Sequence, residues 1–470
     1  MNFNSFEFLV FLPVVLLLYW TIPHKFRWIL LLVASYYFYM SWNAWLVFAI
    51  LGTTVISYLS GILIGSTKKQ GRKKLYVIVT LVVCLGTLVF FKYFNFLLSS
   101  VIDFLNLFSL HIESRTLDII LPVGISFYTF QTLSYVIDVY RGKFIPEKHF
   151  GYYALFVSYF PQLVAGPIEK PGDLLPQLRE KHFLNREDME IGFKTMVCGF
   201  FRKCVVADFC GIYVNRVFSD LPHATGLAVW IAGAFFCIQM YCDFAGYSEI
   251  AIGCARMMGV KLTKNFDRPY FSQSYTEFFR RWHITLNRWF TEYLYIPLGG
   301  NRKGKARKIL NTVVVFSLCG MWHGANWTYL LWGLYAAFFV CAESILPWKP
   351  STTDMGILGR RVLMFFIFVP AGIIFRAESV AQIGQAFFQI FYGTENYLVD
   401  TLAFVGLDFF GLARFFVSLI CMELFCDFVD DRKSFKQKSS IYAYTIIAVM
   451  LCWIALLSTG DISAFQYFQF

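Results

Sequence analysis

Residues 226–253, GLAVWIAGAFFCIQMYCDFAGYSEIAIG, carry Asp243 and Glu249 as their only charged side chains. A helix of about 20 apolar residues crosses the ~30 Å hydrocarbon core of a membrane. A helix also satisfies its own backbone hydrogen bonds, as a lipid environment requires. This stretch therefore predicts a membrane-spanning helix.

Similar apolar stretches recur on both sides of this helix. We expect about 11 to 13 transmembrane or re-entrant helices, near residues 5–22, 27–41, 44–65, 76–97, 117–137, 151–166, 190–217, 226–253, 309–340, 360–376, 404–426 and 441–459. Because Trp and Tyr favour the headgroup layer, three aromatic stretches are expected to be re-entrant or interfacial: 99–108, 282–298 and 383–393. The sequence predicts an all-α integral membrane protein.

The composition supports this class, since 58% of the 470 residues are hydrophobic and only 15% are charged. The formal net charge is +11, but the basic residues form short clusters between apolar stretches, which indicates topology and not nucleic-acid binding. Twelve scattered cysteines without CxxC pairs predict no disulfide framework. Seven dispersed histidines predict no metal site.

Three basic loops, at 68–74, 302–308 and 432–438, are expected on the cytoplasmic side. Counting spans outward from these loops places both termini outside the cytoplasm. Residues 6–20 lack a basic segment before them and a small-residue cleavage site after them. We therefore expect a retained first helix there, not a signal peptide.

One histidine, His323, lies inside a long apolar stretch, within Gly320–Trp327. On a continuous helix Asn326 would share its face and hold the ring in one tautomer. A neutral histidine so held is a natural general base for a hydroxyl that attacks an acyl carbonyl. The alternative is a histidine that only packs between helices.

A second polar cluster lies in residues 278–289. His283 and Asn287 are four residues apart and would share a helical face, with Arg280 one turn earlier and Arg281 beside it. Such cations and an imidazole suit a phosphate-bearing donor or a developing oxyanion. The alternative is a juxtamembrane helix whose arginines meet lipid phosphates.

Three other features are open to a structural explanation. Asp243 and Glu249 need partners, and an ion pair that fixes helix packing is favoured over catalysis; the candidate partners are Arg256, Arg280 and Arg281. Residues 161–169 contain two prolines and Gly166, which indicates a re-entrant loop or a simple loop. Residues 121–127 indicate a kinked span.

Several function classes lose support from the sequence. It contains no GxSxG elbow, Walker loop, HExxH motif or Rossmann fingerprint. The two halves show no internal repeat, which counts against a transporter built from inverted repeats. A non-catalytic transporter or polymer-export subunit remains the alternative to an enzyme, and it would tolerate His323→Gln better.

Five motifs together resemble the membrane-bound O-acyltransferase (MBOAT) family. The similarity is to its bacterial branch of alginate and peptidoglycan O-acetyltransferases, with the teichoic-acid D-alanyltransferase as a nearer cousin than the eukaryotic enzymes. The motifs are FPQLVAGPI at 160–168, YCDFAGYS at 241–248, RRWHITL at 280–286, YLYIPLGGN at 293–301 and MWHG at 321–324.

The resemblance implies a ring of helices around a central funnel, built as one domain over residues 1–470. We expect N-terminal helices in 1–140, the core with the catalytic motifs in 150–345, C-terminal helices in 360–459 and an extracytoplasmic tail in 460–470. It implies His323 as the catalytic histidine and His283 as a second motif histidine. The expected supporting or donor-binding residues are Asn287, Asn326, Arg280, Arg281 and Trp322.

The resemblance also implies substrates, partners and location. The donor would be acetyl-CoA or an acyl carrier thioester, with no permanently bound cofactor. An extracytoplasmic SGNH-type serine esterase or acetyltransferase would pass the acyl group to a polysaccharide such as alginate. The expected location is the bacterial cytoplasmic membrane, crossed several times. The main rival within the enzyme class is D-alanyl transfer from a carrier protein to teichoic acid.

The C-terminal residues 465–470, FQYFQF, resemble the aromatic ending FxYxxF of this branch. One hypothesis is that Tyr467 accepts the acyl group as a phenolic ester and hands it to the partner. The alternative is an aromatic tail anchored at the membrane interface.

Overall fold

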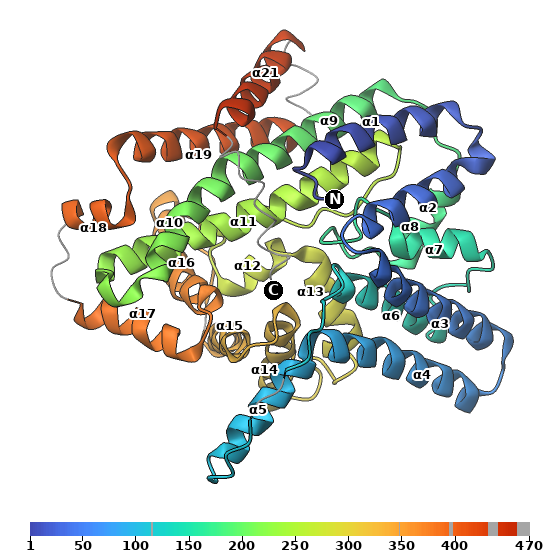
Figure 1. The fold of residues 1–470 in the computed structure, drawn as a ribbon, viewed down its shortest axis with the longest axis horizontal. Helices are drawn as coiled ribbons and strands as arrows, with labels where there is room; N and C mark the ends of the chain where they lie inside the picture. The colour runs from blue at the N-terminus through green and yellow to red at the C-terminus, as the bar shows by residue number, and fades with distance from the viewer. Residues whose placement is uncertain (114–115, 347, 394–397, 431–439, 458–470) are drawn as a thin grey trace. The chain divides into compact units, whose positions relative to one another are not determined.

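The computed structural model describes residues 1–113, 116–346, 348–393, 398–430 and 440–457, and these contain helices and no strand (Figure 1). They divide into two compact units. The first unit holds Met1–Arg186 and Ala255–Thr263, and the second holds Glu187–Cys254 and the described residues from Lys264 onward. The predicted all-α class is confirmed.

The first unit is built from eight α-helices with short 3₁₀ and π-helical segments between some of them. Helices α3, α4 and α6 pack against one another, and α2 packs on α7. The bounds are α1 Phe6–Thr21, α2 His24–Met40, η1 Ala44–Leu46, α3 Val47–Ser66, α4 Gln70–Leu88, η2 Val89–Tyr93, α5 Phe94–Asn106, α6 Ile125–Tyr140, α7 Phe150–Ser158 and α8 Pro171–Arg179.

Two expectations for this unit need correction. Residues 70–106 form one continuous helix through α4, the π-helical η2 and α5, so the aromatic stretch 99–108 is largely an extension of the span and not a separate element. The expected span at 117–137 becomes helical only at Ile125. The preceding Gly124 has a φ of 74°, a left-handed conformation, and a Cβ there would lie 2.6 Å from the Leu163 carbonyl oxygen.

The segment after α7 is irregular and buried. Residues 160–166 form turns and a bend, and all of them are inaccessible. The Gln162 amide donates to the Phe156 carbonyl at 3.2 Å, and the Glu169 carboxylate accepts from the Thr263 backbone N–H at 2.6 Å. These hydrogen bonds give partners to backbone groups that have none because the helix is interrupted.

The second unit contains most of α11, the helix that includes the whole stretch 226–253 with which the sequence analysis began. The bounds are α9 Arg186–Phe200, η3 Phe201–Ala207, α10 Asp208–Ser219, η4 Leu221–His223, α11 Gly226–Met257, η5 Pro269–Phe271, α12 Tyr275–Arg281, α13 Ile284–Phe290, η6 Thr291–Tyr295, α14 Lys305–His323, α15 Trp327–Ile345, α16 Asp354–Arg376, α17 Val380–Tyr392, α18 Leu398–Val405, α19 Phe409–Asp430 and α21 Ser440–Leu457.

The single span expected at 309–340 is wrong, because the structure has two packed helices there, α14 and α15. Helix α14 ends at His323, and Asn326 caps α15 by accepting a hydrogen bond from the Thr328 backbone N–H at 3.1 Å. The two helices approach closely at glycines. A Cβ on Gly320 would lie 2.2 Å from the Tyr329 carbonyl oxygen, and one on Gly333 would lie 2.3 Å from that of Phe316.

The expected span at 404–426 is likewise divided. Helix α18 ends at Val405 and α19 begins at Phe409, so a turn separates them. Gly406 in this turn has a φ of 78°. A left-handed residue ends a helix because the backbone there cannot continue the hydrogen-bond ladder.

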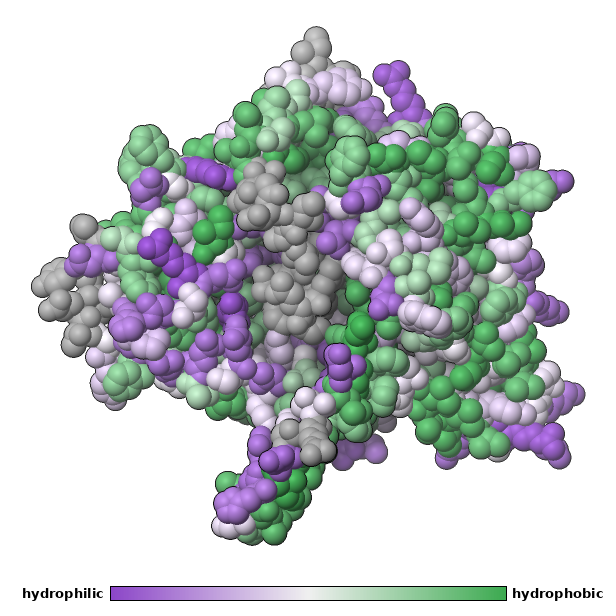
Figure 2. All heavy atoms as spheres, in the orientation of Figure 1, coloured by the Kyte–Doolittle hydropathy of each residue, from purple (hydrophilic) through white to green (hydrophobic). Residues whose placement is uncertain are grey.

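Five helical segments among the described residues are long and apolar enough to cross a membrane: Ala44–Ser66, Gln70–Asn106, Gly226–Met257, Trp327–Ile345 and Asp354–Arg376. Apolar side chains are exposed along α3 and α4, including Phe48, Leu59 and Val82. Figure 2 shows apolar surface gathered where Figure 1 draws α3 and α4. Exposed apolar surface of this extent is expected where lipid covers a protein.

Candidate functional site

His283 lies in the connection between α12 and α13 and is almost fully buried. Its φ is 44°, a left-handed conformation that is strained for a residue with a Cβ. Helix α12 ends at Arg281, and α13 begins at Ile284. The expectation that residues 278–289 form one helix is therefore wrong, and Arg280, His283 and Asn287 do not share a helical face.

The amide of Asn287 holds this connection in place. It donates to the carbonyl oxygens of Phe279 at 2.7 Å and Trp282 at 2.6 Å. These carbonyls lie at the end of α12, where backbone acceptors lack partners within the helix. Asn287 therefore acts on the backbone that carries His283.

The two arginines have surroundings that differ from those of His283. Arg280 is exposed, whereas His283 is buried. Arg281 forms an ion pair with Glu277, 2.6 Å apart on the same helix. Arg280 and Arg281 therefore do not form the one helical face with His283 that the sequence predicted.

The side chain of Asn265 fixes the orientation of the His283 ring. Its Oδ1 lies 3.1 Å from His283 Nδ1 and also accepts from the Thr285 hydroxyl at 2.9 Å, while its Nδ2 donates to Ser248 Oγ at 3.3 Å. Since Oδ1 is an acceptor in this set, Nδ1 carries the proton. The neutral ring then has its lone pair on Nε2.

His283 lies outside the five candidate spans. Burial lowers the pKa of the His283 imidazole well below its usual range, and the influence of His323 lowers it further. The ring is therefore neutral near pH 7, which leaves Nε2 able to accept a hydrogen bond or a proton.

Trp322 lies between the two histidines and brings them into one cluster. Its ring centroid is 6.0 Å from that of His283 and 5.1 Å from that of His323. His323 also makes edge contacts with Trp332 at 5.3 Å and Phe375 at 5.4 Å. The structure thus brings together residues from the α12–α13 connection and the end of α14.

An apolar cavity of about 60 Å³ opens beside His323. Among the described residues, His323 is the only charged or imidazole group in its wall, which otherwise consists mainly of aromatic and small side chains. Sequence reasoning missed this wall, because its residues come from separate elements, namely α11, η5, α12 and the residue after it, α15 and α16. They are Phe236, Cys237, Met240, Tyr270, Tyr275, Phe278, Trp282, Trp332, Phe368, Ala371, Gly372 and Phe375. A water-excluding wall with one imidazole is suited to acid–base chemistry on a small ligand.

Asn326 does not hold the His323 ring as expected. Because α14 ends at His323, the two residues are not on one helix. The Asn326 Oδ1 caps α15, and its Nδ2 donates to the Glu378 carbonyl at 2.8 Å. Its role in the structure is to fix the start of α15.

The carboxylates of α11 find their cations on the π-helical segment η3. Lys203 Nζ lies 2.8 Å from Asp243 and 2.8 Å from Asp208. Arg202 lies 3.3 Å from Glu249 and donates to the Tyr241 hydroxyl at 2.9 Å. The sequence analysis did not name either cation.

Two further expectations concern metals and the C-terminus. No group of three His, Cys, Asp or Glu side chains gathers as metal ligands would, within the residues that the structure describes. Tyr467, the hypothetical acyl relay, lies outside the described residues.

The chain is similar to a family model and to several named bacterial proteins. A model of the membrane-bound O-acyltransferase family matches residues 148–377, which include both histidines. The chain is 37% identical over 432 residues to the probable alginate O-acetylase AlgI of Pseudomonas aeruginosa, which covers 88% of this chain and 82% of that protein.

Two more distant similarities concern other polymers. The chain is 36% identical over 330 residues to the peptidoglycan O-acetyltransferase of Helicobacter pylori, covering 65% of this chain and 62% of that protein. It is 26% identical over 268 residues to the teichoic acid D-alanyltransferase of Bacillus subtilis, covering 52% and 66%.

Proposed function

The chain belongs to the membrane-bound O-acyltransferase family, and from this premise we propose that it moves an acetyl group from a cytoplasmic thioester across the membrane to an extracellular or cell-wall polysaccharide. The relatives named for alginate and peptidoglycan O-acetylation support the acetyl group and a polysaccharide acceptor. Alginate is the first candidate acceptor, since the relatives with that name match most of this chain.

The observation that carries the proposal is the position of His323 in the wall of the apolar cavity. The cavity of about 60 Å³ has room for roughly four water-sized spheres. That volume suits an acetyl group better than the larger D-alanyl group, which adds an ammonium that the apolar wall does not match. The D-alanyl donor is therefore the second candidate.

In the proposed mechanism His323 acts as the general base. The acceptor hydroxyl oxygen bonds to the thioester carbonyl carbon while its proton passes to the imidazole. The carbon–sulfur bond then breaks, and the imidazolium returns the proton to the departing thiolate. Excluding water from the cavity favours transfer over hydrolysis.

His283 supports this step without contacting the substrate, because Trp322 lies between it and His323. Its neutral ring, held by Asn265, is fixed with the lone pair on Nε2. A fixed neutral imidazole adds no competing positive charge beside His323 when the latter takes up a proton. Asn265 is accordingly a positioning residue.

We expect Asn265→Ala to lower the turnover number about 10- to 100-fold with little change in KM, because His283 loses its tautomer and orientation. The assay is acetyl transfer by membranes at equal protein level. Asn265→Asp keeps an acceptor at Oδ1 and should recover part of the loss. A purely structural role would instead lower both variants through protein level alone.

The sidedness of the proposal rests on the charge distribution. The basic loop at 302–308 is expected in the cytoplasm, which places the thioester donor on that side. An extracytoplasmic SGNH-type serine esterase would receive the acetyl group at the other face. Both termini are proposed to be extracytoplasmic.

The first test measures ester-linked acetate on exopolysaccharide and wall material. A deletion strain should lose the acetate, and the wild-type gene should restore it. Membranes given acetyl-labelled CoA should transfer label to polymer, whereas a D-alanyl carrier protein should not support transfer. If only the D-alanyl carrier protein supports transfer of label, D-alanyl transfer becomes the first candidate. If neither donor gives labelled ester on the polymer, the proposed acyl transfer is rejected.

A further inference from the structure

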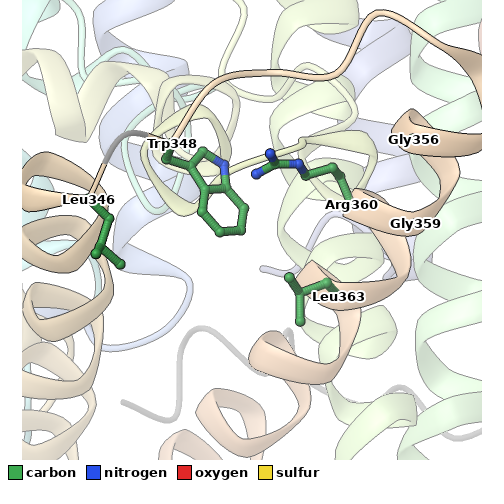
Figure 3. A pocket seen from close by; sticks show the side chains of 6 residues that line it. All are labelled: Leu346, Trp348, Gly356, Gly359, Arg360 and Leu363. Atoms are coloured by element: carbon green, nitrogen blue, oxygen red, sulfur yellow. The ribbon is translucent and has the colours of Figure 1, made fainter.

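A second pocket lies at the ends of two candidate spans, away from the histidine cluster. It has a volume of about 420 Å³ and is wide open. Figure 3 shows its wall: Leu346, Trp348, Gly356, Gly359, Arg360 and Leu363. Leu346 directly follows α15 and the last four belong to α16, so the pocket lies at the end of one candidate span and the beginning of the next.

The Arg360 guanidinium lies over the Trp348 ring, 4.0 Å from its centroid. The two side chains point toward one another in Figure 3. This stacking uses the face of the guanidinium and leaves its N–H donors at the edge. Among the described residues, no hydrogen bond or ion pair engages those donors.

Trp348 is held rigidly beside this arginine. Its Nε1 donates to the Gln273 carbonyl at 3.1 Å, and the Gln273 side chain accepts from the Ser351 backbone N–H at 2.8 Å. Trp348 and Ser351 are thus tied to Gln273, which lies just before α12. A fixed aromatic ring at the end of a span is typical of the membrane interface.

The rest of the wall is apolar and lacks bulk on one side. Gly356, Gly359, Arg360 and Leu363 follow each other at helical spacing and share one face of α16. A Cβ on Gly359 would meet nothing within 4 Å. Leu346 and Leu363 are 58% and 45% exposed, so an apolar surface adjoins the cation.

We propose that this pocket binds a phospholipid with an anionic headgroup. Its phosphate would accept hydrogen bonds from Arg360, and the start of an acyl chain would cover Leu346 and Leu363. A phosphate matches the planar fork of a guanidinium, and an acyl chain matches the apolar surface below it. A soluble phosphate compound would satisfy the arginine but leave the leucines exposed.

The neighbouring Arg361 provides a matched control. Its Nε donates to the Phe271 carbonyl at 3.0 Å, and its guanidinium lies over the Phe271 ring. It is not part of the pocket wall. Arg361→Gln removes the same charge from the same helix as Arg360→Gln.

The experiment titrates the purified full-length protein with phosphatidylglycerol and with phosphatidylcholine of the same acyl chains, and counts bound lipid by native mass spectrometry. Wild type should bind phosphatidylglycerol more tightly. Arg360→Gln should weaken that binding about fivefold, and Arg361→Gln should change it less than about twofold. Gly359→Phe, which fills the pocket and keeps the arginine, should also weaken binding. This second variant tests the proposal even if Arg360→Gln does not fold.

Three outcomes would overturn the proposal. Equal effects of the two arginine variants would mean that only the overall charge attracts lipid. Equal binding of phosphatidylglycerol and phosphatidylcholine would show that the pocket does not require an anionic headgroup. Displacement of phosphatidylglycerol by inorganic phosphate or by CoA would identify the pocket as a site for a soluble phosphate compound.

Discussion

Replacing His323 by alanine should lower acetyl transfer to polymer by about 10²- to 10⁴-fold, the contribution of a well-placed general base. No other imidazole lies in the cavity wall within the part of the chain that the structure describes, so none there takes the place of His323. The measurement is ester-linked acetate in the deletion strain carrying either gene, with membrane levels of both proteins compared. His323→Gln keeps the volume of the side chain and should also be inactive.

A matched control uses another histidine of the same unit. His223 is exposed and lies 2.6 Å from Asp220, away from the cavity wall. His223→Ala should restore acetate like the wild type. Full restoration by His323→Ala at equal protein level would show that the catalytic assignment is wrong. Activity retained by His323→Gln alone would favour the transporter or export subunit.

Replacing Lys203 by methionine should destabilise the second unit by about 3–5 kcal/mol, the typical cost of breaking a buried ion pair by removing one partner. Lys203 is 2% exposed and Asp243 is 1% exposed, so water cannot solvate the carboxylate that Lys203 leaves behind. Asp208 loses the same cation. The readout is the fraction of folded protein and its melting temperature in detergent, measured by size-exclusion chromatography after heating.

Lys264→Met is the control for this prediction. Lys264 and Asp267 form a pair whose side chains are each about half exposed, so its loss should cost about 0–1 kcal/mol. The double variant Lys203→Met with Asp243→Asn removes both charges and should recover part of the lost stability. A double variant less stable than Lys203→Met would contradict the ion-pair explanation.

The sequence named His283 and His323 as site residues, and the structure differs from the local geometry that it predicted around them. Trp322 and His323 are neighbours in sequence, and Trp322 does contact His283. The helical spacing that linked His283 to Asn287 and His323 to Asn326 failed, because both histidines lie at helix ends and not within helices. Periodicity describes positions within one helix and says nothing about the residue at which that helix ends.

The ends themselves had signals in the sequence that the apolar pattern concealed. Gly324 and Asn326 form a stop and a cap between α14 and α15. The whole stretch is apolar and long enough for one membrane span, so its length favoured a single helix over the two helices that these residues indicate. A break between two helices of this length turns one predicted crossing into a helical hairpin.

The sequence alone determined the helical membrane class, because apolar length and composition are properties of each segment by itself. It also determined the family motifs and their order. Only the tertiary structure decided that Asn265 orients His283, that Lys203 neutralises Asp243, and which walls enclose His323. These partners lie on different segments, and their contacts depend on which helix faces pack together, which no local pattern specifies.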